Sequence, residues 1–209
     1  MKTKLKERGG KGILKAVYIT GSPGTGKTRT AKRLAKLLGG THLELGEIAR
    51  RRGFTLGYDQ ERGCAILDEL KLSRFLREVF SKAENPYVLE AHFSAKLPSG
   101  IKPWVFVLRC APETLARRLR SKGYSERKIA ENLWAEILDF CLQEALDRFE
   151  AGSIHEVNVG GRSVKTVTAE MLKVIEGRQK PHVGSFNWLQ QLERDGKLER
   201  MVKRGGAVP

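Results

Sequence analysis

Gly21-Ser22-Pro23-Gly24-Thr25-Gly26-Lys27-Thr28 is the stretch of this sequence that decides its fold. It matches the pattern Gly-x-x-x-x-Gly-Lys-Thr, whose backbone N–H groups surround the phosphates of a nucleoside triphosphate. Residues 13–20 before it are apolar and β-branched, as in a buried strand, and apolar side chains recur at helical spacing in residues 28–38 after it. A helix that begins here directs its free N–H groups at an anion. Because an ordinary glycine turn has no need for Lys-Thr at this position, the stretch predicts a nucleotide-binding site.

The rest of the chain fits one α/β domain. Its 209 residues are enough for one sizeable core with some excess. Aliphatic runs alternate with amphipathic stretches, which favours a P-loop core with a mostly parallel sheet covered by helices on both faces. One such stretch follows Ser125, which can cap a long helix whose apolar face extends from Ile129 to Phe149.

The sequence has the features of a cytoplasmic protein. No apolar run is long enough to cross a bilayer, and the first residues lack the apolar core of a secretion signal. The three cysteines, Cys64, Cys110 and Cys141, have no metal-ligand spacing and are expected to stay reduced. We therefore expect a cytoplasmic monomer with no membrane partner.

The chain carries a formal net charge of +15, and both ends contribute to it. Residues 1–11 hold five basic residues and one acidic residue, and residues 177–209 hold seven basic and three acidic residues. We expect a basic tail over residues 1–12 and a basic extension over 177–209, neither of them needed for catalysis. Within the extension, we expect residues 186–203 to form a short helical appendage that is docked or mobile. Contact with RNA or a ribosomal particle would use this charge. Solubility, or the charge-rich composition of proteins from hot environments, is the alternative.

A phosphate loop is shared by several enzyme classes, so second motifs must separate them. The Asn-Lys-x-Asp base reader of GTPases is absent from the sequence. Hexameric AAA-type ATPases have a phosphate loop of similar sequence, but they have two acidic residues after an apolar strand. This chain has Leu89-Glu90-Ala91-His92 at that position. Nucleoside monophosphate kinases fit better, because they insert a small acceptor-binding (NMP-binding) excursion after the first helix and an arginine-bearing lid late in the core. Residues 43–67 and about 120–130 stand at these two positions.

Within this group the sequence resembles one branch, the archaeal and eukaryotic adenylate kinases of the isoenzyme-six type, also called CINAP. The landmarks occur in order over residues 13–176, which we take as the kinase domain. Besides the loop they are Gly46-Glu47-Ile48-Ala49-Arg50, Gly57-Tyr58-Asp59, Cys64-Ala65-Ile66-Leu67-Asp68-Glu69, Glu90-Ala91-His92, Val105-Phe106-Val107-Leu108-Arg109, Gly123-Tyr124-Ser125-Glu126-Arg127-Lys128, Glu131-Asn132 and Ala135-Glu136-Ile137. Two positions depart from the family, which often has Asp at Glu90 and frequently Arg at Lys122. Lysine lacks the bidentate grip of arginine on phosphate.

The resemblance implies the reaction ATP + AMP ⇌ 2 ADP with Mg²⁺. It implies that loop residues and one lid residue bind the ATP phosphates, namely Gly24, Thr25, Gly26, Lys27, Thr28, Arg29 and Lys122. Lys27 would also act in catalysis by reaching the β- and γ-phosphates. Mg²⁺ would be held by the Thr28 hydroxyl and, through water, by Glu90, because this hard cation prefers oxygen ligands. The alternative for Glu90 is an exposed acid at a strand end.

The other implied site residues lie outside the loop. Arg50 would bind the AMP phosphate, with Tyr58 and Asp59 shaping that site, and the lid would contain Lys122, Tyr124 and Arg127. His92 would lie near the transferred group, although a lone histidine is more often a packed or capping residue. Arg109 ends a strand at the face where open parallel sheets bind ligands. Because burying an unpaired arginine is costly, we expect it to take a phosphate partner and to act in catalysis.

The family has a second reported activity. Its members assist maturation of the small ribosomal subunit, bind a ribosomal protein of the S-eleven family and use ATP hydrolysis as a timer. The resemblance therefore implies ATPase activity, with this ribosomal protein and rRNA as partners. An assembly ATPase for which AMP phosphorylation is secondary is the alternative to an adenylate kinase. The basic tails favour the assembly factor, and the acceptor site with its lid favours the kinase.

Overall fold

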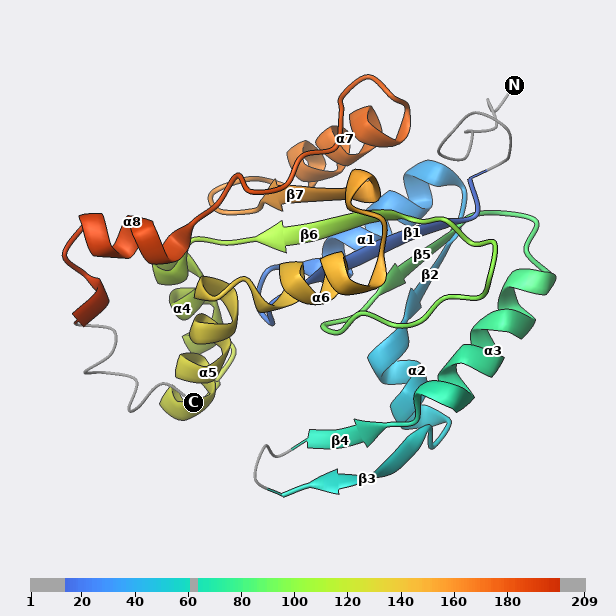
Figure 1. Ribbon diagram of the computed structural model, residues 1–209, viewed down its shortest axis with the longest axis horizontal. Coiled ribbons are helices and arrows are strands. Elements are labelled where there is room, and N and C mark those ends of the chain that lie inside the picture. Colours follow the sequence, from blue (N-terminus) through green and yellow to red (C-terminus); the bar gives the residue numbers. More distant parts are fainter. Residues whose placement is uncertain (1–13, 61–63, 200–209) are drawn as a thin grey trace.

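The computed structural model describes residues 14–60 and 64–199, so the predicted tail over 1–12 and the last part of the predicted extension, 200–209, lie outside the described residues. In the described part, five parallel strands form a sheet in the order β2-β5-β1-β6-β7 (Figure 1). The central strand β1 pairs with β5, where Val17 faces Val88, and with β6, where Val17 faces Trp104. The strands are β1 (Ala16–Gly21), β2 (Thr41–Glu44), β5 (Tyr87–Glu90), β6 (Trp104–Arg109) and β7 (Ile154–Asn158), which follows a 3₁₀ turn (Ala151–Ser153). The predicted α/β fold with a parallel sheet is confirmed.

Helices cover both faces of this sheet, because alternate side chains of a strand point to opposite faces. Val17 and Ile19 pack in one apolar cluster, and Ala16 and Tyr18 pack in another on the opposite face. The first cluster includes α1 (Lys27–Leu38), α4 (Pro112–Arg120), α5 (Glu126–Ile137), α7 (Val164–Ile175) and α8 (Trp188–Arg194), and the second includes α3 (Glu69–Ser81) and α6 (Phe140–Arg148). In the described ranges, none of the helices combines the length and the apolar character needed to cross a membrane.

The single long helix predicted after Ser125 is wrong, because the structure has two helices there. Ser125 does cap α5, since its side chain accepts a hydrogen bond from the backbone N–H of Lys128. After α5, however, Asp139 adopts a left-handed conformation with φ 58°, and α6 begins at the next residue. The Asp139 carboxylate accepts a hydrogen bond from Arg109. This tertiary contact holds a conformation that residues other than glycine seldom adopt, and the apolar spacing could not reveal it.

Between β2 and α3 the chain leaves the sheet and forms a small lobe. Helix α2 (Leu45–Arg51) leads into an antiparallel hairpin of β3 (Thr55–Asp59) and β4 (Cys64–Leu67). In Figure 1 this hairpin projects away from the main sheet, beside the first turns of α3. Leu56 and Ile66 of the hairpin remain exposed. The lobe stands where the sequence predicts acceptor binding.

The described part of the C-terminal extension is docked on the core. The backbone N–H of Glu156 in β7 donates to the carbonyl oxygen of His182 at 3.0 Å. Helix α8 then buries Trp188 and Leu192 in the apolar cluster that contains α5. Figure 1 shows α8 lying beside α4 and α5. Of the two alternatives predicted for residues 186–203, docked or mobile, the structure shows the docked one for the described residues 186–199.

Candidate functional site

The phosphate loop connects the end of β1 to the start of α1. A Cβ on Gly21 would lie 2.6 Å from the backbone oxygen of Leu108 in β6, and the φ of Gly21 is 137°, so this position requires glycine. Among the described residues, no side chain caps the start of α1 after Gly26. The first turn of α1 contains Lys27 and Thr28 but no acid. Uncapped N–H groups at a helix start without acidic side chains favour binding of an anion.

Lys27 lies inside the loop. Its Nζ donates to the carbonyl oxygens of Gly21, at 2.7 Å, and Ser22, at 3.3 Å. Burial lowers the pKa of Lys27 below its ordinary value, and the nearby Lys122 lowers it further, against opposing effects of Cys141 and Glu90. Both hydrogen-bond acceptors of the ammonium group are neutral carbonyl oxygens. A bound polyphosphate would supply negative charge in their place.

Thr28 and Glu90 meet beside the loop, one from α1 and the other from the end of β5. The Thr28 hydroxyl donates to Oε1 of Glu90 at 2.5 Å, and Oε2 of Glu90 lies 2.7 Å from Nε2 of His42 in β2. Because Glu90 is only 3 % exposed, the alternative of an exposed strand-end acid is wrong. A hydroxyl beside a carboxylate is a set of oxygen ligands that fits Mg²⁺. His42 is not recognisable from the sequence, since the pairing of β2 with β5 brings it to this place.

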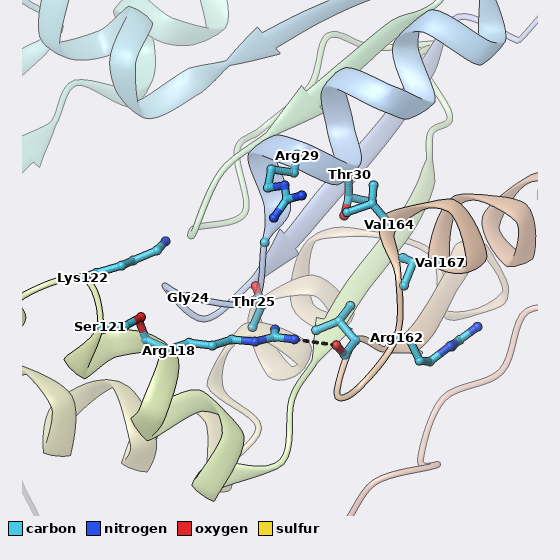
Figure 2. Close-up of a pocket in the computed structure, with 12 residues that line it drawn as sticks. Gly24, Thr25, Arg29, Thr30, Arg118, Ser121, Lys122, Arg162, Val164 and Val167 are labelled. Carbon is cyan, nitrogen blue, oxygen red and sulfur yellow. Dashed lines mark hydrogen bonds between the residues drawn. The ribbon is translucent and has the colours of Figure 1, made fainter.

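A cavity of about 270 Å³ opens on the other side of the loop (Figure 2). Its lining includes five residues predicted to bind ATP, namely Gly24, Thr25, Gly26, Arg29 and Lys122. Arg118 reaches from α4 to the carbonyl oxygen of Val159, a hydrogen bond of 2.8 Å that crosses the cavity in Figure 2. Arg162, at the start of the segment that leads into α7, forms part of the lining and pairs with Glu170 at 2.6 Å. The cavity thus combines apolar side chains with guanidinium groups next to the phosphate loop.

Sequence reasoning missed Arg118 and Arg162 as lining residues. Arg118 shares its helix with Arg117 and Arg120, and the sequence does not show which of the three faces the loop. Arg162 follows β7, whose carboxyl end lies at the same edge of the sheet as the loop. Because ligands bind at this edge of a parallel sheet, the position of Arg162 shortly after β7 is the feature of the sequence that could have identified it as a lining residue.

The prediction of a phosphate partner for Arg109 is contradicted by the structure. The guanidinium is 1 % exposed, and its Nε donates to Oε1 of Glu136 at 2.9 Å. Its other nitrogens donate to Glu156 and Asp139. Burial alone would lower the pKa of Arg109, but these carboxylates, Glu136 above all, outweigh burial and raise the pKa above its ordinary value. A buried arginine does need a partner, and here the three carboxylates come from two segments of the same chain, the end of α5 and β7.

The predicted acceptor and lid residues occupy exposed positions on either side of the loop. Arg50 lies on α2 and Tyr58 on β3, both with exposed side chains, and Asp59 ends β3. Tyr124 and Arg127 lie at the junction of α4 and α5, where Arg127 pairs with Glu131 at 3.3 Å. The structure does not bring these residues into contact with the loop. They would reach a ligand at the loop only if the small lobe and the junction of α4 and α5 moved toward it.

His92 follows β5 and lies near α2 of the small lobe and near Lys27 of the loop. A Cβ on Gly46 of α2 would be 4.0 Å from Cε1 of His92. Desolvation lowers the pKa of His92 below its ordinary value of 6.5, and the positive charges of Lys27 and Lys128 lower it further. The ring is therefore neutral at pH 7, with one nitrogen free to accept a hydrogen bond.

We expect His92 to titrate below pH 6.5 in the free protein. Because folding lowers its pKa, the contribution of the neutral ring to stability is present above the unfolded pKa and is lost as the pH falls through the folded value. Nuclear magnetic resonance titration of the Cε1 proton measures this midpoint. Lys27→Met should raise the midpoint, whereas Lys32→Met, on the exposed face of the same helix, should not. A midpoint at or above pH 6.5 in the unaltered chain would contradict the prediction.

The sequence is similar to a family model and to known proteins named as adenylate kinases. A family model described as "AAA domain" matches residues 17–139. The chain is 34 % identical over 183 residues to "Putative adenylate kinase" of Thermococcus onnurineus (strain NA1), covering 85 % of this chain and 93 % of that protein. It is 36 % identical over 141 residues to "Adenylate kinase isoenzyme 6 homolog" of Drosophila melanogaster, covering 68 % of this chain and 79 % of that protein.

Solved structures share the fold at low sequence identity. The tunicamycin resistance protein of Deinococcus radiodurans superposes with a TM-score of 0.53 at 19 % identity, covering 81 % of this chain and 99 % of that one. An uncharacterized protein from Eubacterium ventriosum ATCC 27560 gives a TM-score of 0.54 at 15 % identity, covering 79 % and 100 %. These two similarities concern the fold alone. Because the sequence relatives exceed 30 % identity over most of their length, this chain belongs to the adenylate kinase family of the isoenzyme-six type.

Proposed function

We propose that this chain catalyses the reversible transfer of a phosphoryl group from ATP to AMP, with Mg²⁺, to give two ADP. Membership of the family supports a nucleotide kinase of the adenylate kinase type. The observation that carries the finer proposal is the convergence of Lys27, the Thr28–Glu90 pair and a cavity around one loop. This arrangement supports the proposal, because it would give the phosphates, the metal ion and the nucleoside of ATP separate places.

ATP would bind with its phosphates on the backbone N–H groups of the loop and on Lys27. Its nucleoside would enter the cavity beside Arg118, where the valines of the lining offer apolar surface to a base. Arg29 and Lys122 line the same cavity and would add positive charge near the phosphates. Mg²⁺, held by Thr28 and through water by Glu90, would neutralise charge on the transferring phosphates.

AMP would bind on the side of the acceptor lobe, with its phosphate on Arg50 and with Tyr58 and Asp59 shaping the site. Phosphoryl transfer depends mainly on positioning and on neutralisation of charge. The neutral ring of His92, near the loop and α2, would orient the acceptor or a water molecule. Closure of the lid that contains Lys122, Tyr124 and Arg127 would exclude water and thereby favour AMP as the acceptor.

We also propose that the chain hydrolyses ATP and acts in the cytoplasm, as a monomer, in the biogenesis of the small ribosomal subunit. Its partners there would be a ribosomal protein of the S-eleven family and rRNA. A favourable observation is that α1 exposes Lys32, Arg33 and Lys36 and contains no acidic residue. Such a surface attracts phosphate backbones. In this proposal residues 13–176 form the catalytic domain, with the described part of 177–209 docked on it.

The two activities are separated by the dependence of ADP formation on AMP. With MgATP present, we expect AMP to increase the rate of ADP formation several-fold, because a bound acceptor replaces water. Coupled measurement of ADP with and without AMP tests this. If AMP leaves the rate unchanged, the assembly ATPase is the activity of this chain and the kinase proposal fails.

We expect Arg50→Ala to raise the KM for AMP by about 10- to 100-fold, the usual worth of a hydrogen bond to a charged group. Hydrolysis of ATP in the absence of AMP should be unchanged, because Arg50 lies on the acceptor lobe. Arg51→Ala is the matched control, since Arg51 is exposed on the same helix and pairs with Glu47 at 2.5 Å. Equal loss of AMP-free hydrolysis in Arg50→Ala would exclude the assigned role.

A further inference from the structure

The side chain of Glu136, near the end of α5, connects the phosphate loop to the C-terminal extension. Its Oε2 accepts a hydrogen bond from the Ser22 hydroxyl at 2.7 Å. Its Oε1 accepts from Nε of Arg109 at 2.9 Å, from the backbone N–H of Cys110 at 3.1 Å and from the indole Nε1 of Trp188 at 3.1 Å. Glu136 is 2 % exposed. A buried carboxylate with this many donors is fixed in one orientation.

Ser22 is the residue through which Glu136 reaches the loop. The carbonyl oxygen of Ser22 accepts hydrogen bonds from the Thr25 hydroxyl, at 2.8 Å, and from Nζ of Lys27, at 3.3 Å. A rotation of Ser22 would therefore shift two residues that are predicted to contact ATP. Glu136 restrains that rotation from behind the loop, on the side away from the ligand. Such support by a neighbouring buried group sets how well a binding loop is preorganised.

Arg109 makes this arrangement compatible with a phosphate ligand. A bare carboxylate behind the loop would repel ATP, because like charges in a medium of low dielectric interact strongly. The guanidinium of Arg109 contacts Glu136, Glu156 and Asp139 together and offsets part of their charge. The cation that was expected to hold phosphate thus offsets part of the negative charge behind the loop.

The C-terminal extension closes the same cluster from the other side. The backbone N–H groups of Gly184 and Ser185 donate to Oε2 of Glu156, at 2.5 and 3.0 Å. The ring of Phe186 lies 5.9 Å from the Arg109 guanidinium carbon and stacks on Trp188 with centroids 5.4 Å apart. Trp188 then donates its indole N–H to Glu136. Residues 184–188 therefore cover the buried side of the cluster and supply one of the donors that orient Glu136.

From these contacts we infer that Glu136 is a positioning residue of the phosphate loop, and that the C-terminal extension acts on ATP binding through Trp188, Glu136 and Ser22. This inference rests on the proposed nucleotide-binding function of the loop and adds to it a part of the chain outside the predicted kinase domain. It is an alternative to the expectation that the extension is not needed for catalysis, and the affinity measurements below decide between them. The physical reason is that the extension completes a buried hydrogen-bond network that includes a loop residue.

The test compares the dissociation constant of MgATP, measured by titration calorimetry, in the unaltered chain and in single and double variants. Ser22→Ala should weaken binding about tenfold, because it removes the hydrogen bond to a charged group. Ser22→Thr, which keeps the hydroxyl, should restore most of the affinity. Trp188→Phe should weaken binding by less, about threefold, near the lower end for an ordinary hydrogen bond, because the indole reaches the loop only through Glu136.

The double variant gives the decisive result. If Trp188 acts through Glu136 and Ser22, then Trp188→Phe should add nothing to the effect of Ser22→Ala, because the two changes break one chain of contacts. Leu192→Ala is the matched control on α8, since Leu192 is buried and should lose packing, and hence melting temperature, with no change in MgATP affinity. Ser22→Ala changes few atoms, so it keeps the positioning role testable even if Trp188→Phe does not fold.

Two outcomes would overturn the inference. One is equal MgATP affinity in the unaltered chain and Ser22→Ala, and the other is a full Trp188→Phe effect in the Ser22→Ala background. Failure of the proposed function looks different. If the unaltered chain binds MgATP but forms no ADP in response to AMP, the kinase proposal fails, and the affinity series still decides the role of Glu136.

Discussion

Lys27→Met is expected to lower kcat/KM for MgATP by about 10²- to 10³-fold, the usual loss when one preorganised donor to a developing charge is removed. In the structure the Lys27 ammonium lies within the loop, held by the carbonyl oxygens of Gly21 and Ser22. When ATP binds, Lys27 would exchange these contacts with neutral oxygens for ionic contacts with phosphate. Steady-state kinetics of ADP formation, with AMP saturating, measure the effect.

The stability of the folded protein should change little in Lys27→Met. Burial lowers the pKa of Lys27, which means that the folded state disfavours its charge and loses little electrostatic energy when the charge is removed. Lys32→Met is the matched control, because Lys32 is an exposed lysine of the same helix. A kcat/KM of Lys27→Met close to that of Lys32→Met would show that the loop does not bind the transferred phosphates through this residue.

Arg109→Met is expected to lower the free energy of unfolding by about 3–5 kcal/mol, the cost of leaving buried carboxylates without their cation. Glu136 and Glu156 have side chains that are almost completely buried, and both bond to this guanidinium. For a domain of this size the loss corresponds to a fall in melting temperature of about 10 °C. Calorimetry or circular dichroism at neutral pH measures it.

The exposed ion pair of Arg120 with Glu126 provides the comparison. Arg120 donates to both carboxylate oxygens of Glu126, at 2.9 and 3.0 Å, but it lies on the surface. Arg120→Met should therefore leave the melting temperature nearly unchanged, because water and salt screen surface pairs. If Arg109→Met melted at the same temperature as Arg120→Met, the buried cluster would not contribute to stability.

The local order of strand, loop and helix could be predicted because its determinants are contiguous in sequence. The apolar run before Gly21, the glycines of the loop and the spacing of Ala31, Leu34 and Leu38 specify β1, the phosphate loop and α1 without reference to the rest of the chain. Glu90 could be singled out in the same way, since it ends a short apolar strand. The parallel pairing of β5 with β1 brings Glu90 to the loop that follows β1, where it contacts Thr28.

Predictions failed where a residue's role depends on distant partners. The apolar face after Ser125 gave no sign of the left-handed residue Asp139, whose conformation is held by Arg109. His42 reaches Glu90 only because β2 pairs with β5. In the extension, Trp188 and Leu192 could be recognised from the sequence as apolar residues of a helical appendage, but only the structure shows that their burial docks it on the core.

By itself the sequence determined that this chain has a phosphate loop at the start of a helix in an α/β fold, because a few consecutive residues specify that geometry. Only the tertiary structure decided what surrounds the loop: which acids neutralise Arg109, which arginine of α4 lines the cavity, and that Trp188 reaches Ser22 through Glu136. These contacts join segments far apart in the chain. They exist because the burial of apolar faces also brings polar groups together, and buried polar groups must form hydrogen bonds or ion pairs with one another.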